Sequence, residues 1–334
     1  MPRLRFMPLF FLLLPVIYSC NKKLDVNADW KDITVVYGLL DQTQDTTFIK
    51  ITKAFLGPGD ALRFAKIPDS SNYPVGSLEV RLDEYQGTGF IQSYRCETII
   101  RHSLNSGITI FDTNKLLYFT TVNLKQDYTY KLYIKNKRTG KEITSQTDLV
   151  HDFSINKPTG NAITFQTDQS FNVKWEHPAN GKRYQLVVRF FYSEDSKANP
   201  NHPKMHSVDW FLFNNIYAID ATNPQSFDLW FSCDAFYKFV GASIDTSSLV
   251  TREAHHCLFI ITAAAPDLTT FIEVSEPSLS LVQEKPPYTN IVNGIGIFSS
   301  RITASDSIGI SKPTKKELYT NSQTQNRGFL DPGK

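Results

Sequence analysis

The sequence predicts an all-β protein made of two consecutive β-sandwiches, with a short helical insertion in the second. Apolar and polar residues alternate in many short segments, a period typical of half-buried strands, and turn-forming residues separate these segments. The length of 334 residues suits about two domains of roughly 150 residues each. With 41% hydrophobic and 13% aromatic residues, the composition excludes a disordered chain, and four cysteines are too few for a disulfide-built mini-domain.

The first 19 residues have the layout of a secretory signal peptide. Two arginines precede an apolar run over residues 6–18, which is shorter than the roughly 20 residues that a membrane-spanning helix needs. The run ends in Ser19-Cys20, and residues 17–20 resemble the bacterial lipobox, in which the cysteine is acylated before cleavage. We therefore expect residues 1–19 to be removed and Cys20 to carry the lipid. The alternative is an ordinary secreted protein with a cysteine near its cleavage site.

An acylated Cys20 would hold the protein on a membrane, since each buried methylene contributes about 0.8 kcal/mol. Residues 20–31 are polar and are expected to form a tether between lipid and fold. Loss of Arg3 and Arg5 with the signal reduces 35 basic residues to 33, which equals the 33 acidic residues. A neutral mature chain argues against a nucleic-acid partner.

Three cysteines remain beyond the lipid site, in a compartment where disulfides persist. Cys233 with Cys257 is the preferred pair, because closing a loop of about 25 residues would contribute roughly 3–3.5 kcal/mol. The alternative is that Cys96, Cys233 and Cys257 are all buried, inert thiols.

The first sandwich is expected over residues 32–150. The clearest alternation lies in residues 78–83 and 128–135, and further strands are expected over residues 33–40, 47–55 and 116–122. Turns are expected at residues 87–89 and 137–140, where glycines follow or flank polar residues.

The second sandwich is expected over residues 158–310, after a boundary at Lys157-Pro158-Thr159-Gly160. Strands over residues 171–176 and 184–192 carry Trp175 and Tyr184, and this order of Trp, turn and Tyr resembles the fibronectin type III domain of the immunoglobulin-like class. The resemblance implies that both rings lie in the core between two sheets.

The inserted helix is expected to begin at Asp234, because apolar residues then recur at helical spacing. Gly241 inside it weakens the helix by about 1 kcal/mol, so it needs tertiary support. Gly294 and Gly296 in the last strand indicate a bulge or close backbone packing. Residues 311–334 are expected to form a loosely ordered polar tail.

Taken together, the Cys20 lipobox, the opening strand over residues 34–40, the strand over residues 128–134 and the closing segment over residues 288–298 resemble an uncharacterised lipoprotein family of Bacteroidetes outer membranes. Members are often encoded beside TonB-dependent receptors. The resemblance implies an accessory envelope protein and supplies no catalytic residue. Surface-exported members commonly carry acids just after the lipidated cysteine, whereas Asn21-Lys22-Lys23 follows here, so the leaflet is left open between periplasm and cell surface.

No catalytic motif and no metal site is predicted. Ser154 and Lys157 match a Ser-x-x-Lys pattern, but they lead into a proline rather than a helix. His202 and His206, with Asp209, lie in a Pro-rich stretch that favours a solvated loop. His255 and His256 are adjacent, so on a strand they would point to opposite faces.

The best candidate for an interaction patch is Trp210, Phe211 and Phe213, since successive aromatic residues cover both faces of one strand. The alternative is a central strand buried on both sides. Most other aromatics fall on the apolar faces of the expected strands, where a sandwich core needs bulk.

We therefore expect a membrane-anchored outer-membrane lipoprotein that acts, without a cofactor, as a non-enzymatic binding or assembly partner of another envelope protein. Two alternatives stay open. An exposed, co-planar pair of aromatic rings in a shallow groove would favour a glycan-binding accessory lipoprotein. An envelope hydrolase would require a cleft that brings distant Asp, Glu or His residues within hydrogen-bond reach.

Overall fold

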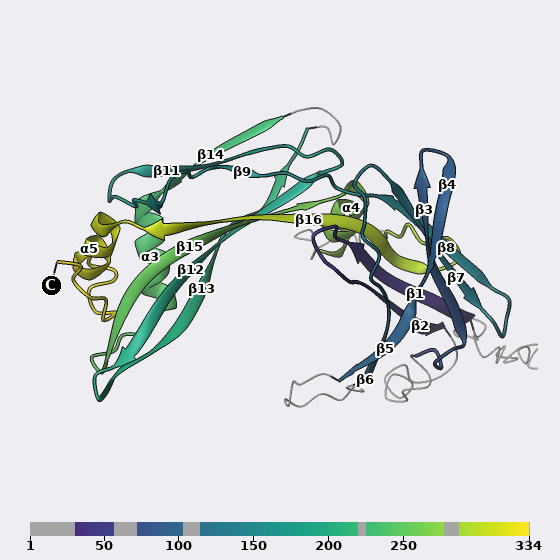
Figure 1. The fold of residues 1–334 in the computed structure, drawn as a ribbon, viewed down its shortest axis with the longest axis horizontal. Coiled ribbons are helices and arrows are strands. Elements are labelled where there is room, and N and C mark those ends of the chain that lie inside the picture. Colours follow the sequence, from purple (N-terminus) through teal and green to yellow (C-terminus); the bar gives the residue numbers. More distant parts are fainter. Residues whose placement is uncertain (1–30, 57–71, 103–113, 220–224, 277–286, 334) are drawn as a thin grey trace, which may run out of the picture.

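The computed structural model describes residues 31–56, 72–102, 114–219, 225–276 and 287–333. These residues are mostly in β-strands, arranged in several sheets with short helices, which confirms the predicted all-β sandwich class (Figure 1). The strands in chain order are β1 (Lys31–Leu40), β2 (Thr47–Leu56), β3 (Leu78–Gln86), β4 (Gly89–Arg95), β5 (Glu97–His102), β6 (Asn114–Thr120), β7 (Thr129–Asn136), β8 (Glu142–Asp148), β9 (Ile155–Lys157), β10 (Ala162–Ile163), β11 (Ser170–Glu176), β12 (Arg183–Ser196), β13 (Asn199–Tyr217), β14 (Ser226–Ser232), β15 (Val250–Ala264) and β16 (Ile295–Ile310). The helices are α3 (Cys233–Ser243), α4 (Pro266–Ser275) and α5 (Lys312–Thr320).

A nine-stranded sheet runs the length of the molecule in the order β13-β12-β15-β16-β1-β2-β6-β5, with β10 beside β16. A four-stranded sheet, β4-β3-β7-β8, covers one end, and a three-stranded sheet, β14-β11-β9, covers the other. Each smaller sheet encloses its own cluster of buried apolar side chains against the large sheet. We call the two ends the N-terminal lobe, with β1 to β8, and the C-terminal lobe, with β9 to β15 and the three-stranded sheet.

Strand β16 belongs to both lobes. Its first part, Ile295 to Ser300, pairs in parallel with β1, and its second part, Arg301 to Gly309, pairs antiparallel with β15. Figure 1 shows it as one continuous strand between the two ends of the molecule. Phe298 is accordingly buried in the N-terminal cluster and Ile302 in the C-terminal one. The closing segment therefore joins the two lobes.

The chain first passes between the lobes at two adjacent residues. Leu149 is buried in the N-terminal cluster, and Val150 is buried in the C-terminal cluster. The hydroxyl of Ser300 lies beside this crossing: it donates to the carbonyl of Asp148 at 2.7 Å and accepts from the amide of Val150 at 3.1 Å. One fully buried serine thus connects the first crossing to β16. Its hydroxyl both donates and accepts a hydrogen bond, as a buried polar group requires.

The glycines near the start of β16 allow a close approach of two backbones, as their spacing predicts. A Cβ on Gly296 would lie 2.0 Å from the carbonyl oxygen of Val36, and its φ of +110° also disfavours any other residue. A Cβ on Gly294 would lie 2.8 Å from the carbonyl oxygen of Thr34. The parallel pairing of β16 with β1 therefore requires glycine at these positions.

The core of the C-terminal lobe holds the two rings that the fibronectin-like pattern places there. Trp175 on β11 and Tyr184 on β12 are fully buried, with ring centroids 5.5 Å apart, and they come from different sheets. The second sandwich is predicted to start at residue 158. Strand β9, over residues 155–157, pairs with β11, so the chain enters this lobe before that position.

The inserted helix α3 forms over nearly the predicted residues, but its N-cap is Ser232, and Asp234 lies in the first turn. Its tertiary support comes from the C-terminal segment: a Cβ on Gly241 would lie 2.3 Å from the carbonyl oxygen of Gln323. The small glycine lets that backbone pack directly on the helix.

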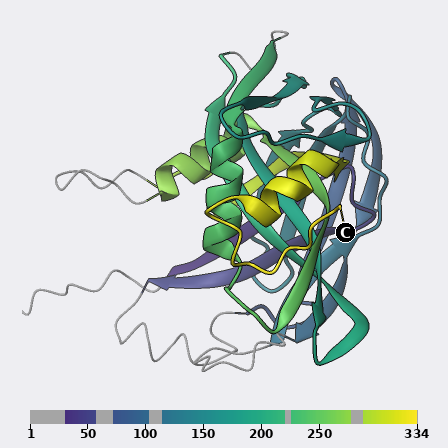
Figure 2. The same ribbon diagram turned by 90° about the vertical axis from the view of Figure 1, so that its left-hand side faces the viewer.

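The expectation of a loosely ordered tail is wrong. Residues after Ser311 form α5, beside α3 at the end of the molecule, and then turn back to a bridge between Phe329 and Arg252 (Figure 2). Leu318 and Phe329 are buried in the C-terminal cluster, and Thr324 is fully buried. Leu318 and Phe329 thus anchor this polar segment to the core, while Tyr319 and Leu330 stay exposed.

Candidate interaction edge

Two consecutive strands of the N-terminal lobe, β4 and β5, form the free edges of two facing sheets. Strand β4 is the last strand of the four-stranded sheet, and β5 is the last strand of the nine-stranded sheet. Between them the chain changes sheet at Cys96, whose amide donates to the carbonyl of Val80 at 2.9 Å and whose side chain is buried. This anchored bend places both edges on one side of the lobe.

The side chains along these strands are apolar and exposed. Phe90 and Ile91 on β4 are 56% and 46% exposed, and Ile99 and Ile100 on β5 are 38% and 50% exposed. Because each pair is adjacent in sequence, apolar groups lie on both faces of each strand. We call these four residues with their strands the β4–β5 edge.

An edge of this kind can bind a strand of another protein. Among the described residues, β4 pairs only with β3, and β5 only with β6, so each has one row of backbone donors and acceptors without a strand partner. Free edges of this kind accept a further strand, and exposed apolar side chains beside them add contact area.

The sequence reasoning missed this edge, although it carries a readable signal. Phe90-Ile91 and Ile99-Ile100 are adjacent apolar pairs in short strand-like runs, the same pattern that singled out Trp210-Phe211. An apolar pair breaks the alternation of a half-buried strand, so one member must point outward unless both faces are covered.

The candidate patch on β13 is divided by the fold. Trp210 stacks on Phe239 of α3 at 5.7 Å, and Phe213 stacks on Trp175 at 6.0 Å, so both face the core. Only Phe211 points outward, with 64% exposure. The alternative of a central strand is wrong, because β13 is the last strand of the nine-stranded sheet.

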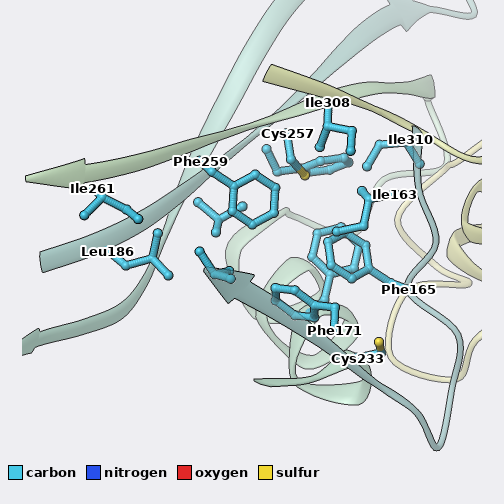
Figure 3. Packing of buried hydrophobic residues seen from close by; sticks show 14 of the residues in the cluster. Ile163, Phe165, Phe171, Leu186, Cys233, Cys257, Phe259, Ile261, Ile308 and Ile310 are labelled. Atoms are coloured by element: carbon cyan, nitrogen blue, oxygen red, sulfur yellow. The ribbon is translucent and has the colours of Figure 1, made fainter. Parts of the chain in front are cut away.

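The predicted Cys233–Cys257 disulfide is not formed; both residues are free thiols, as is Cys96. Figure 3 shows the sulfur atoms of Cys233 and Cys257 apart, on separate sides of the packed rings. Burial raises the pKa of all three thiols, to about 12 for Cys96. The three cysteines are therefore core residues, which was the alternative interpretation.

Three of the candidate histidines contact neighbouring side chains: His206, His255 and His256. His206 stacks on Tyr192 with ring centroids 5.6 Å apart, whereas Asp209 forms a bidentate pair with Arg189 at 2.6 and 2.9 Å. This hydrogen bonding lowers the pKa of Asp209.

His255 bonds to Ser193 at 2.9 Å, and His256 stacks on Phe191. Ser193 and Phe191 lie on the same face of β12, and the register of β15 against β12 shifts at this point. The expectation that the two histidines point to opposite faces is therefore wrong, because an irregularity in β15 interrupts the alternation. In the part of the chain that the structure describes, no three His, Cys, Asp or Glu side chains are grouped to hold a metal ion.

A polar pocket of about 230 Å³ lies where the lobes meet. It brings together two acids from different elements, Asp148 at the end of β8 and Asp267 in α4. Asp148 accepts a hydrogen bond from the hydroxyl of Thr129 at 2.5 Å, and Asp267 accepts from Tyr288 at 2.5 Å and from the Asn290 amide at 3.0 Å. These hydrogen bonds fix the position of each carboxylate against its neighbours, and we assign both acids a structural role.

Cys20 and the preceding signal lie outside the described residues. Within the described helices, none combines the length and apolar character needed to cross a membrane. Comparison of the chain with protein-family models and with curated proteins gives no match.

Proposed function

We propose that the chain is a membrane-anchored envelope lipoprotein that acts as a non-enzymatic binding or assembly partner, docking through the β4–β5 edge. The observation that carries this proposal is the combination of two free strand edges with four exposed apolar side chains on the same lobe. An uncovered edge of this kind exposes the protein to aggregation, and a cognate partner removes that liability.

The position of the tether supports the same interpretation. Only ten residues, 21–30, separate Cys20 from the start of β1, and an extended chain of that length spans at most about 36 Å. Strand β1 belongs to the N-terminal lobe. Acylation at Cys20 would therefore keep the lobe with the β4–β5 edge near the membrane, where an integral envelope protein is within reach.

The chemistry of the edge defines the kind of partner. It fits a protein that presents its own strand edge together with apolar side chains, so that backbone hydrogen bonds and apolar contacts form together. The resemblance to lipoproteins encoded beside TonB-dependent receptors suggests such a receptor, or a protein bound to it, as the first partner to examine.

A pull-down from detergent-solubilised membranes tests the proposal. The lysine variant Ile100→Lys places a charge on the edge, and Leu249→Lys places one at a residue that is 74% exposed in the C-terminal lobe. We expect the proteins recovered with the unaltered chain to be retained by Leu249→Lys and lost from Ile100→Lys. Equal recovery by both variants would overturn the proposed edge.

The anchor is tested separately with Cys20→Ala. This variant should lose both acyl labelling and membrane partitioning, because the lipid is the proposed attachment. Unchanged partitioning would contradict the lipoprotein assignment without bearing on the edge.

A further inference from the structure

One large aromatic side chain lies on the outer face of the three-stranded sheet. Trp230 on the edge strand β14 is 66% exposed, whereas the neighbouring Leu229 and Phe231 face the core. Its partner across the strand pair is Asn172 on β11. Because directly opposite residues share a face, the indole and the carboxamide lie side by side.

Hydrogen-bonding groups are already positioned next to this ring. Asp228 lies two residues before Trp230 and so on the same face, and its Oδ1 accepts a hydrogen bond from Nδ2 of Asn172 at 3.0 Å. That bond fixes the amide and the carboxylate relative to each other. The second carboxylate oxygen and the amide oxygen are left to accept further donors.

The rest of this face is polar. Ser170 pairs with Ser232 on one side of the Trp230 pair, and Lys174 pairs with Asp228 on the other. A stable protein interface buries about 800 Å² on each partner around an apolar centre, which a single tryptophan among serines and charges does not supply. A ligand the size of one sugar ring needs only a flat apolar surface and a few hydroxyl acceptors beside it.

We infer that Trp230, Asn172 and Asp228 form a binding site for a neutral saccharide. The apolar C–H face of a pyranose ring stacks on the indole, and its hydroxyls donate to Asp228 and to the Asn172 carbonyl. Lys157 and Lys174 share this face with Asp228 and Glu176, so its formal charges balance. An acidic sugar is disfavoured because Asp228, whose carboxylate contacts the bound sugar, would repel it. The site is in the C-terminal lobe and is independent of the β4–β5 edge.

Another exposed aromatic of this lobe, Phe211, provides a matched comparison. Phe211 is 64% exposed, nearly as much as Trp230, but it lies on β13 in the nine-stranded sheet. Its directly opposite residue is Val187, so no amide or carboxylate stands across from it. Replacing Phe211 removes an exposed ring without touching the inferred site.

Titration of the full chain with cellohexaose, in a detergent without a sugar headgroup, tests the inference. Trp175 is fully buried and Trp210 packs on the core, so Trp230 is the solvent-exposed reporter among the described tryptophans. We expect cellohexaose to bind, to shift the tryptophan emission and to protect it from acrylamide quenching. A hexamer of galacturonic acid should bind more weakly.

The variants decide where binding occurs. Trp230→Ala should weaken binding by at least about tenfold, Trp230→Phe by less because a ring remains, and Phe211→Ala not at all. Circular dichroism of each variant checks that the fold is retained. The inference is overturned if cellohexaose does not bind at millimolar concentration, if Trp230→Ala binds as well as the unaltered chain, or if the acidic hexamer binds more tightly.

Discussion

The side chain of Asn290 pairs with both backbone groups of Phe298, as a neighbouring strand would. Its Nδ2 donates to the Phe298 carbonyl at 2.7 Å, and the Phe298 amide donates to its Oδ1 at 3.0 Å. The same Nδ2 also donates to Asp267 in α4, and the Asn290 carbonyl accepts from Ser145 in β8. One asparagine therefore links β16, α4 and β8 where the lobes meet.

Replacement of Asn290 by alanine should lower the free energy of unfolding by about 2–3 kcal/mol, because two backbone groups lose their partners at a half-buried position. Chemical denaturation of the purified chain measures this. Val292→Ala, at an exposed residue of the same segment, should change stability by less than about 0.5 kcal/mol. Equal effects of the two substitutions would contradict the assigned role.

Gly296→Ala should destabilise the chain by at least about 3 kcal/mol or prevent folding, since its Cβ would overlap the carbonyl of Val36 and its φ is positive. Gly76→Ala is the control. Gly76 also has a positive φ, of +79°, but open space around it, so only the backbone strain of about 1 kcal/mol applies. Thermal unfolding of both variants separates overlap from strain, and similar losses would mean that close packing is unimportant.

Cys96, Cys233 and Cys257 should not react with a thiol reagent in the native chain at neutral pH, because burial raises the pKa of each thiol and shields it. In denaturant without a reductant, all three should react. If only one of the three reacts after unfolding, a disulfide joins the other two.

The stability of the chain should fall above pH 10, partly through Tyr288. Burial, together with the hydrogen bond to Asp267, raises the pKa of Tyr288 from 10.0 to about 12. The folded state thus holds this proton more tightly, so its contribution is complete below the unfolded pKa and is lost as the pH rises toward 12. Between a pH below 10 and a pH near 12, the free energy of unfolding should therefore fall less for Tyr288→Phe than for the unaltered chain. An equally steep decline in the variant would rule out this contribution.

The sequence predicts local structure well wherever one face of a strand is buried. The alternation in residues 78–83 and 128–135 gives β3 and β7, and the glycines of residues 87–89 and 137–140 give the turns that follow them. Trp175 and Tyr184 lie in the core as the fibronectin-like order implies. In each case the period of two reports burial directly.

The sequence does not predict how segments far apart in the chain pair and pack. The sharing of β16 by both lobes depends on pairing with β1 and β15, which local patterns do not encode. The separation of Cys233 from Cys257 depends on the packing of rings between them. The β4–β5 edge required knowledge of which strands end the sheets, and without it Phe90-Ile91 cannot be distinguished from a pair buried on both faces.

Site-specific photocross-linking in intact envelopes tests the central claim most directly. A photoreactive side chain at Ile100 lies on the β4–β5 edge, and one at Leu249 lies on exposed surface of the C-terminal lobe. The account predicts one discrete cross-linked envelope protein from Ile100 and none from Leu249. No product from Ile100, or the same product from both positions, would contradict it.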